Sequence, residues 1–227
     1  MVTLIFSPPW FYGIDALFEF FAVLATALLS FYSYKLYSFN KRTSYKYFSF
    51  SFLLISLSFI FKIITNMIIY FPVLKQHTIG FFTITYRIVT ETNVVAILGL
   101  FIYHLLMLLG LFGIYWIIGK SREKNKFLLL LYFVVLSAFF STSSYLIFHI
   151  TAAVFLVYIS YLYYTTYYEK KKTTTYLVFL SFFLLFLSQI IFIFIFLDLR
   201  IYVFGEIIQL AGYLLLLYEY YLLARKI

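Results

Sequence analysis

The chain has 227 residues, of which 65% are hydrophobic and only 11% are charged. A soluble domain carries roughly 25% charged residues and about half apolar ones, so this composition excludes a soluble globular protein and indicates a membrane protein. The absence of cysteine excludes disulfides, iron–sulfur clusters and thiol catalysis. The formal net charge of +9 would suggest nucleic acid as a partner of a soluble protein, but here its distribution along the chain gives a better explanation.

Long apolar segments predict about seven transmembrane helices, since a helix needs about 20 apolar residues to cross the bilayer. The apolar run from Phe127 to Tyr168 is long enough for two helices, and the hydroxyl cluster Ser141–Ser144 favours a turn between them. Uninterrupted apolar runs lack the alternation of a membrane β-barrel. The sequence therefore predicts an all-α polytopic bundle, a single transmembrane domain over residues 1–227, with helices at 13–34, 47–71, 94–118, 127–141, 145–167, 174–197 and 201–224.

The basic residues predict the orientation of this bundle. Thirteen of the 17 Lys and Arg residues lie on one side of a seven-helix topology, and by the positive-inside rule that side faces the cytoplasm. We therefore expect a multi-pass protein of the cell membrane with its N-terminus outside and its C-terminus in the cytoplasm. The thirteen residues are Lys35, Lys41, Arg42, Lys46, Lys120, Arg122, Lys124, Lys126, Lys170, Lys171, Lys172, Arg225 and Lys226.

The longest segment between the predicted helices is 72–92, on the outer side. Within it, Phe82, Ile84, Tyr86 and Ile88 alternate with polar residues. This period of two predicts either a short strand or a strip that lies in the membrane interface.

Polar residues inside the predicted helices fall into stripes at helical spacing. On the first helix, Asp15, Glu19, Thr26, Ser30 and Ser33 lie roughly on one face. Since ionisable groups are expensive in hydrocarbon, such stripes should face the interior of the bundle. On the second helix, Ser51, Ser58, Lys62 and Asn66 follow one another at spacings of seven, four and four residues.

Several of these polar residues share a similar depth. Five of them lie about five to eight residues from the outer ends of their helices, which corresponds to about 7–12 Å. These five are Glu19, Lys62, Gln189, Glu206 and Gln209. His104 lies deeper, near the predicted midplane. The candidate polar pocket in the outer half comprises Glu19, Lys62, Asn66, His104, Gln189, Glu206 and Gln209.

Two interpretations of this set remain open. One is a pocket open to the outside, with Lys62 as its cation and Glu19, Glu206 and His104 as partners. The other is a structural ion pair of Lys62 with Glu19 or Glu206, with the amides joining neighbouring helices at about 1 kcal/mol each. No metal or cofactor is expected, because His104 and His149 are predicted at depths too different to share one haem. Small residues on the third helix, Ala96, Gly99, Gly110 and Gly113, predict close helix packing.

No catalytic motif rises above background, so an enzyme is the least favoured of three classes. The first hypothesis is a non-enzymatic, receptor-like sensor or a subunit of a membrane complex. Its partners would be the lipid bilayer, a small ligand from the outer side and a membrane or signalling protein, with no nucleic acid. The alternative is a small secondary transporter or ion-coupled carrier that uses Lys62 and the buried carboxylates.

Overall fold

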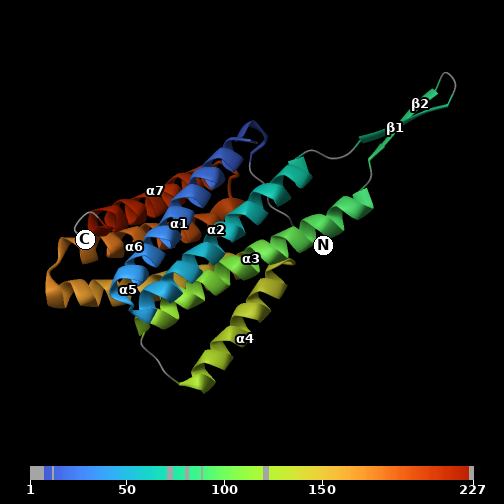
Figure 1. Ribbon diagram of the computed structural model, residues 1–227. Helices are drawn as coiled ribbons and strands as arrows, with labels where there is room; N and C mark the ends of the chain where they lie inside the picture. The colour runs from blue at the N-terminus through green and yellow to red at the C-terminus, as the bar shows by residue number, and fades with distance from the viewer. Residues whose placement is uncertain are drawn as a thin grey trace.

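The computed structural model describes residues 8–11, 13–70, 74–79, 82–87, 89–119 and 123–224. The backbone alone is described for residues 9, 69–70, 74–79, 82–87, 89–93 and 223–224. Seven of the described helices are long and apolar enough to cross a membrane, which confirms the predicted helical bundle (Figure 1). They are α1 (Ile14–Asn40), α2 (Thr43–Tyr70), α3 (Val89–Gly119), α4 (Lys124–Ser141), α5 (Tyr145–Lys170), α6 (Thr173–Ile193) and α7 (Arg200–Ala224), with single 3₁₀ turns at Pro9–Phe11 and Phe194–Phe196.

Most helix ends lie outside the predicted bounds. α1 continues to Asn40 instead of 34, α2 begins at Thr43 instead of 47, and α3 begins at Val89 instead of 94. Hydropathy marks only the part of a helix that lies in hydrocarbon. Tyr and Lys allow a helix to continue through the interface, because their stems stay apolar while their polar ends reach water. The turn predicted at Ser141–Ser144 is confirmed, since α4 ends at Ser141 and α5 begins at Tyr145.

The α1 and α5 helices are each followed by a lysine in the left-handed backbone conformation. Lys41 follows α1 with φ 52°, and Lys171 follows α5 with φ 51°. Their backbone N–H groups donate to the carbonyls of Tyr37 and Tyr167 at 2.8 and 2.7 Å. This geometry closes the last turn and places a positive charge at the negative end of the helix dipole. The chain then reverses within residues 41–42 and 171–172, so α1–α2 and α5–α6 are antiparallel neighbours.

A two-stranded hairpin joins α2 to α3. β1 (Leu74–Ile79) pairs antiparallel with β2 (Phe82–Arg87), with Leu74 opposite Arg87 and Ile79 opposite Phe82. Of the two predictions for this segment, the short strand is therefore confirmed. The hairpin projects beyond the ends of α2 and α3 (Figure 1), and we call this end of the bundle the hairpin end.

The opposite end, which we call the basic end, contains the α1–α2 and α5–α6 connections, the last turn of α3, the first turn of α4 and the end of α7. Nine of the thirteen basic residues assigned to one side of the membrane lie here. Lys120, Arg122, Arg225 and Lys226 lie outside the described residues.

Six of the helices form a ring, and α4 lies outside it. Around the ring, neighbouring pairs are α1–α2, α2–α3, α3–α5, α5–α6, α6–α7 and α7–α1, whereas α4 packs against α3 and α5. Only 17% of the spanning window of α4 is buried, compared with 39–44% for the other helices. α4 leans away from the bundle at the basic end and approaches α3 at its other end (Figure 1).

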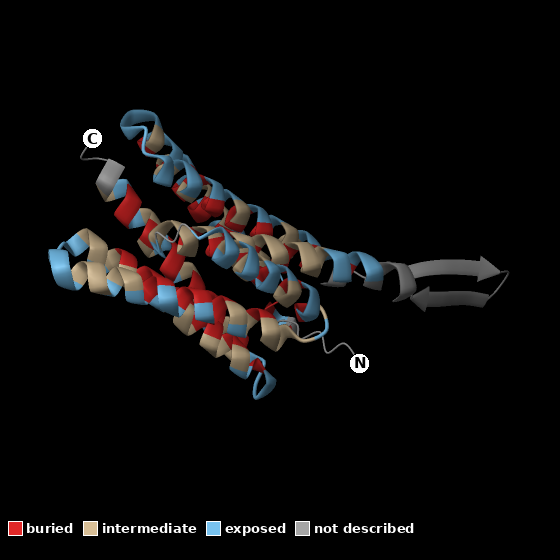
Figure 2. Cartoon of the chain, turned by 90° about the horizontal axis from the view of Figure 1, so that it is seen from below, coloured by how far each residue is buried: buried red, intermediate tan, exposed pale blue. Residues whose placement is uncertain are grey.

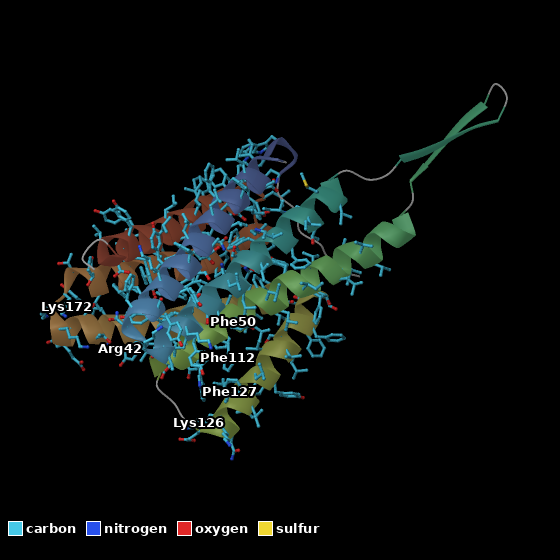
Figure 3. The ribbon with its side chains drawn as sticks, in the orientation of Figure 1. Arg42, Phe50, Phe112, Lys126, Phe127 and Lys172 are labelled. Carbon is cyan, nitrogen blue, oxygen red and sulfur yellow. The ribbon has the colours of Figure 1, made fainter. Side chains whose placement is uncertain are left out.

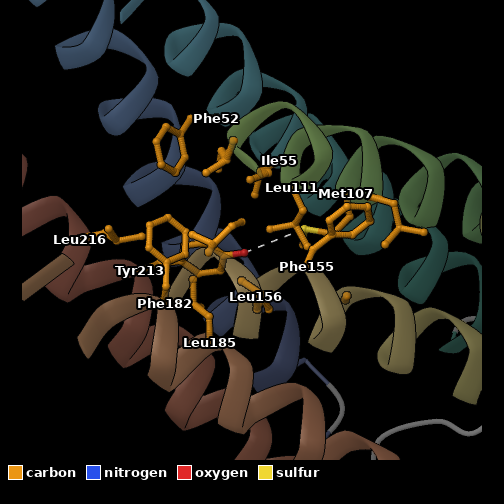
Figure 4. Packing of buried hydrophobic residues seen from close by; sticks show 14 of the residues in the cluster. Phe52, Ile55, Met107, Leu111, Phe155, Leu156, Phe182, Leu185, Tyr213 and Leu216 are labelled. Carbon is orange, nitrogen blue, oxygen red and sulfur yellow. Dashed lines mark hydrogen bonds between the residues drawn. The ribbon is translucent and has the colours of Figure 1, made fainter. Parts of the chain in front are cut away.

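The interior of the ring holds the main apolar core. Buried residues follow the inner faces of the helices, while exposed residues cover their outer faces (Figure 2). At mid-height, Phe52, Leu108, Phe182, Leu185 and Leu216 come from four helices and are each at most 2% exposed. Figure 4 shows this packing, with the Tyr213 hydroxyl 3.9 Å from the sulfur of Met107. The middle of the bundle is therefore filled with hydrocarbon and aromatic side chains.

Small residues bring α2 and α3 close together, as predicted. A Cβ atom on Gly110 would lie 2.9 Å from the backbone oxygen of Ser51 and 2.5 Å from Ile55. Gly99 and Gly113 face Thr65 and Ser51 in the same way. Glycine at these positions allows an approach that any side chain would prevent.

Candidate functional site

A lysine and two glutamates from three different helices meet near the hairpin end. The Nζ atom of Lys62 on α2 lies 2.9 Å from Oε1 of Glu19 on α1 and 2.7 Å from Oε1 of Glu206 on α7. Glu19 is completely buried, the Glu206 side chain is 4% exposed and the Lys62 side chain 12%. The helical spacing that placed these residues on inward faces is thus confirmed.

Asn66 completes this group, which we call the charge cluster (Glu19, Lys62, Asn66 and Glu206). It lies one turn after Lys62 on α2, and its Nδ2 donates to Oε1 of Glu19 at 2.9 Å. The same carboxylate oxygen therefore accepts from both an ammonium and an amide. The second oxygen of Glu19, Oε2, is buried and has no hydrogen-bond partner. Such an acceptor is costly to leave unpaired, so it is a position where a donor or a cation would bind favourably.

Two tyrosine rings surround the ammonium of Lys62. Its Nζ lies 5.8 Å from the ring centroid of Tyr103 on α3 and 5.6 Å from that of Tyr202 on α7. A cation within about 6 Å of an aromatic face is attracted by the ring quadrupole. These two residues were not predicted as site residues. Tyr202 could have been found, since it lies one turn before Glu206 on the same face of α7.

The cluster contains more carboxylates than cations. Two carboxylates and one ammonium carry a formal charge of −1 when all are ionised. Asp15, one turn before Glu19, is also completely buried. Its Oδ1 accepts from the backbone N–H of Gly13 at 2.9 Å and of Ala16 at 2.8 Å, at the positive end of the α1 dipole. A buried excess of negative charge favours the uptake of a positive one.

Gln209 lies on the same face of α7, one turn beyond Glu206 towards the centre of the bundle. It is 4% exposed, and its Oε1 has no hydrogen-bond partner. Its side chain interacts with the hydroxyl of Tyr213. Gln209 therefore lies between the charge cluster and the apolar core and is oriented inward, as predicted.

The remaining predicted residues, His104 and Gln189, belong to two separate pairs. Nδ1 of His104 on α3 is 2.7 Å from the hydroxyl of Ser141 at the end of α4. Nδ1 of His149 on α5 is 2.8 Å from Oε1 of Gln189 on α6. The ring of Phe148 lies 4.3 Å from that of His104 and 5.0 Å from that of His149, between centroids. Each histidine thus has its own partner on a neighbouring helix.

A second polar group lies towards the basic end. Glu219 on α7 is 2% exposed, and its Oε2 has no hydrogen-bond partner. The hydroxyls of Ser33 on α1 and Ser160 on α5 are also buried without a partner. Ser30 on α1 is satisfied instead, since it donates to the backbone oxygen of Ser49 at 2.8 Å. Glu219 was not among the predicted site residues.

The charge cluster therefore joins α1, α2 and α7 and holds an unpaired, buried acceptor. In the described part of the chain, no three His, Asp or Glu side chains converge as a metal site. Comparisons with family models, with curated proteins and with solved structures found no match. The functional proposal consequently depends on the geometry of the cluster and on its position in the bundle.

Proposed function

We propose that the chain is a non-enzymatic, receptor-like sensor, or the sensing subunit of a membrane complex, that responds to a cation from the outer side. The charge cluster is the sensing site. The observation that carries this proposal is the single lysine shared by two buried carboxylates, with Oε2 of Glu19 left without a partner.

The charge of the cluster defines the class of ligand. An anion would add to the excess of negative charge, and a neutral molecule would leave it unchanged. A unit positive charge, from a proton or a small monovalent cation, would neutralise it. Either one could also bind at Oε2 of Glu19. Thermal unfolding in different salts and at different pH distinguishes a proton from a metal cation.

The position of the cluster gives the binding event a structural consequence. Lys62 connects α2 to α7 through Glu206 and to α1 through Glu19. A cation bound at one carboxylate competes with Lys62 for it and weakens one of these two links. α7 then changes its contact with α1 and α2, and it runs from the hairpin end to the basic end. A change in its position would thus carry the signal across the bilayer.

The positive-inside rule supports placing the basic end in the cytoplasm and the charge cluster in the outer half of the membrane. Among the described connections at the basic end, 41–42 and 171–172 are only two residues long. Neither of these two connections is long enough to hold an output domain, and we propose that the signal passes to a partner protein.

The apolar middle of the bundle favours a sensor over a carrier. Phe59, Leu185 and Leu216 are almost fully buried. The rings of Phe59 and Tyr213 lie 5.5 Å apart between centroids, and Tyr213 lies between Glu206 and Glu219 on α7.

The buried hydroxyls of Thr26 and Ser58 in this apolar layer donate to backbone carbonyls of their own helices. A carried ion would therefore find few free polar groups there to replace its hydration shell. A sensor needs no such path.

A proton-coupled carrier is the second candidate, and Glu219 is the observation that favours it. Glu206 and Glu219 lie on the same helix, 13 residues apart, which corresponds to about 20 Å. Glu219 leaves one buried carboxylate oxygen without a partner, and so does Glu19 beside Glu206. An unpaired buried acceptor near each end of α7 is an arrangement that alternating access could use.

Thermal unfolding of the purified protein in lipid nanodiscs tests the proposal. The midpoint is measured at constant ionic strength in sodium, potassium or N-methylglucamine chloride, and over a pH series. A ligand that binds only the folded state stabilises it by RT ln(1 + [L]/Kd). We expect the midpoint of the wild type to depend on one of these cations or on the proton, and this dependence to be lost in Glu19→Gln.

Equal midpoints for wild type and Glu19→Gln under every condition would contradict a cation site. Proton or sodium flux in proteoliposomes distinguishes the two functions. The sensor proposal predicts no flux above that of empty vesicles, whereas flux abolished by Glu219→Gln would establish the carrier.

A further inference from the structure

A cavity of about 610 Å³ lies between α2, α3 and α4, away from the charge cluster. It touches the first turns of α2 and α4 and the last turns of α3, so it is at the basic end. Its volume is in the range of small-molecule sites, which is about 300–1,000 Å³. Its walls are formed mainly by apolar and aromatic side chains, including Phe50, Leu54, Leu109, Phe112, Phe127 and Leu131.

The cavity exists because α4 stands apart from α2. α4 packs mainly on α3 and α5, and its first half leans outward (Figure 1). The rings of Phe112, Trp116 and Phe127 form the contact between α3 and α4, with centroids 5.1–6.1 Å apart. On the other side, Phe50 of α2 is exposed. Figure 3 shows Phe50, Phe112 and Phe127 around the space between these helices.

Positive charges lie at the rim of this cavity. Lys46 directly precedes the wall residue Tyr47 on α2, and Lys124 lies about one turn before the wall residue Phe127 on α4. Arg42 begins the same end of α2 (Figure 3). All three basic side chains are exposed. Lys126, by contrast, is paired with Glu123 at 2.9 Å.

We propose that this cavity binds one anionic membrane lipid, with a hydrocarbon chain between α2 and α4 and its headgroup at Arg42, Lys46 and Lys124. The site is independent of the proposed sensing function. The apolar walls match the chain, and the three cations match the charge of the headgroup. Each Lys or Arg near an anionic lipid headgroup increases its binding about fivefold. A zwitterionic lipid would fit the same walls but would gain less from these cations.

The order of side chains along the cavity supports a lipid over a soluble ligand. Tyr47 and Trp116 lie towards the basic end of the cavity, together with Ile117 and Phe127. Amphipathic rings such as those of Tyr and Trp occupy the level of lipid headgroups. Leu54 and Leu109 lie further along α2 and α3, towards the centre of the bilayer. The cavity thus changes from amphipathic to apolar in the direction in which a lipid changes from headgroup to chain.

Trp116 offers a direct probe, because the chain has only two tryptophans. The variant Trp10→Phe leaves Trp116 as the single fluorophore. This variant is reconstituted into phosphatidylcholine vesicles. The vesicles contain a small mole fraction of one probe lipid, either brominated phosphatidylglycerol or brominated phosphatidylcholine. Bromine on the lipid chains quenches nearby tryptophan. From the quenching of Trp116, we expect an affinity for brominated phosphatidylglycerol that is at least about fivefold higher than for brominated phosphatidylcholine. This preference should decrease as the salt concentration increases.

Three matched variants define the outcome. The variant Trp116→Phe, which keeps only Trp10 at the hairpin end, should show no headgroup preference. Replacing Arg42, Lys46 and Lys124 by Gln should bring the preference for phosphatidylglycerol close to one. The variant Leu54→Phe with Leu131→Phe should reduce quenching by both lipids.

Equal quenching by the two lipids in the Trp10→Phe protein, or a preference that survives the Gln substitutions, would overturn the proposal. Undiminished quenching in the filled variant would place the lipid outside the cavity and also overturn it.

Discussion

The ammonium of Lys62 on α2 lies 2.7 Å from the carboxylate of Glu206 on α7, although 144 residues separate them in the sequence. The same ammonium lies 2.9 Å from Glu19 on α1. One side chain therefore connects three helices inside a membrane-spanning bundle. Buried charges of this kind are stable only while each one keeps its partner.

Lys62→Met should destabilise the protein strongly. The substitution keeps the length and apolar stem of the side chain but leaves two buried carboxylates without a cation. Breaking a buried pair in this way costs about 3–5 kcal/mol. The free energy of unfolding in bicelles or nanodiscs, measured by steric trapping or denaturant titration, checks this value.

Removing the excess charge together with the lysine should restore much of that loss. In Lys62→Met with Glu19→Gln and Glu206→Gln, no ionised group of the cluster remains. We expect this triple variant to be more stable than Lys62→Met alone, because buried ion clusters can be replaced by neutral groups at little cost. A triple variant as unstable as the single one would show that Lys62 contributes by packing and not by charge.

Asn66→Leu should cost about 1–3 kcal/mol, since it removes the amide that donates to Glu19. The neighbouring Met67 is 52% exposed and serves as control. Met67→Leu should stay within about 0.5 kcal/mol of the wild type. Equal effects of the two substitutions on the free energy of unfolding would mean that the hydrogen bond from Asn66 does not contribute to stability.

Gly110→Ala tests the close packing of α2 on α3. Its Cβ would lie 2.9 Å from the backbone oxygen of Ser51, so the helices must separate, at a cost of about 1–3 kcal/mol. Gly119, at the end of the same helix, has nothing within 4 Å of such a Cβ. Replacing glycine by alanine inside a helix gains helix propensity, so a lower midpoint of thermal unfolding in Gly110→Ala reports the steric contact alone. Gly119→Ala, which has no such contact, should leave the midpoint almost unchanged. A stabilised Gly110→Ala protein would be inconsistent with the observed helix spacing.

Ser141→Ala should loosen α4. The hydroxyl of Ser141 bonds to His104 of α3, and α4 has few other buried contacts. We expect faster hydrogen–deuterium exchange across residues 124–141, with the exposed Ser143→Ala as control. Unchanged exchange in Ser141→Ala would mean that the apolar packing of α4 against α3 and α5 holds the helix without this hydrogen bond.

The sequence was sufficient to predict the helices, their inward polar faces and the approximate level of Glu19, Lys62 and Glu206. Each of these properties depends on a single helix, through hydropathy or through its period of 3.6 residues. The small residues of α3 also act locally, because a glycine allows close approach whichever helix is opposite.

The ion pair of Lys62 with Glu19 or Glu206 was one of two interpretations of the sequence, and Lys62 contacts both carboxylates. The other pairings between helices could not be predicted in the same way. That His104 meets Ser141 and His149 meets Gln189 depends on which helices are neighbours and how each is rotated about its axis. The same holds for α4, whose place outside the ring leaves the cavity beside Phe50. Helix order in a bundle results from packing of whole faces, and one sequence read helix by helix does not contain it.

The central claim is that the charge cluster takes up a positive charge at its carboxylates. Infrared difference spectroscopy of the protein in lipid tests this most directly, because neutralising a carboxylate changes its stretching bands. The account predicts a carboxyl signal on acidification or on exchange of N-methylglucamine for sodium, present in wild type and lost in Glu19→Gln or Glu206→Gln. A signal identical in wild type and in both variants, or no carboxyl signal under either change, would contradict it.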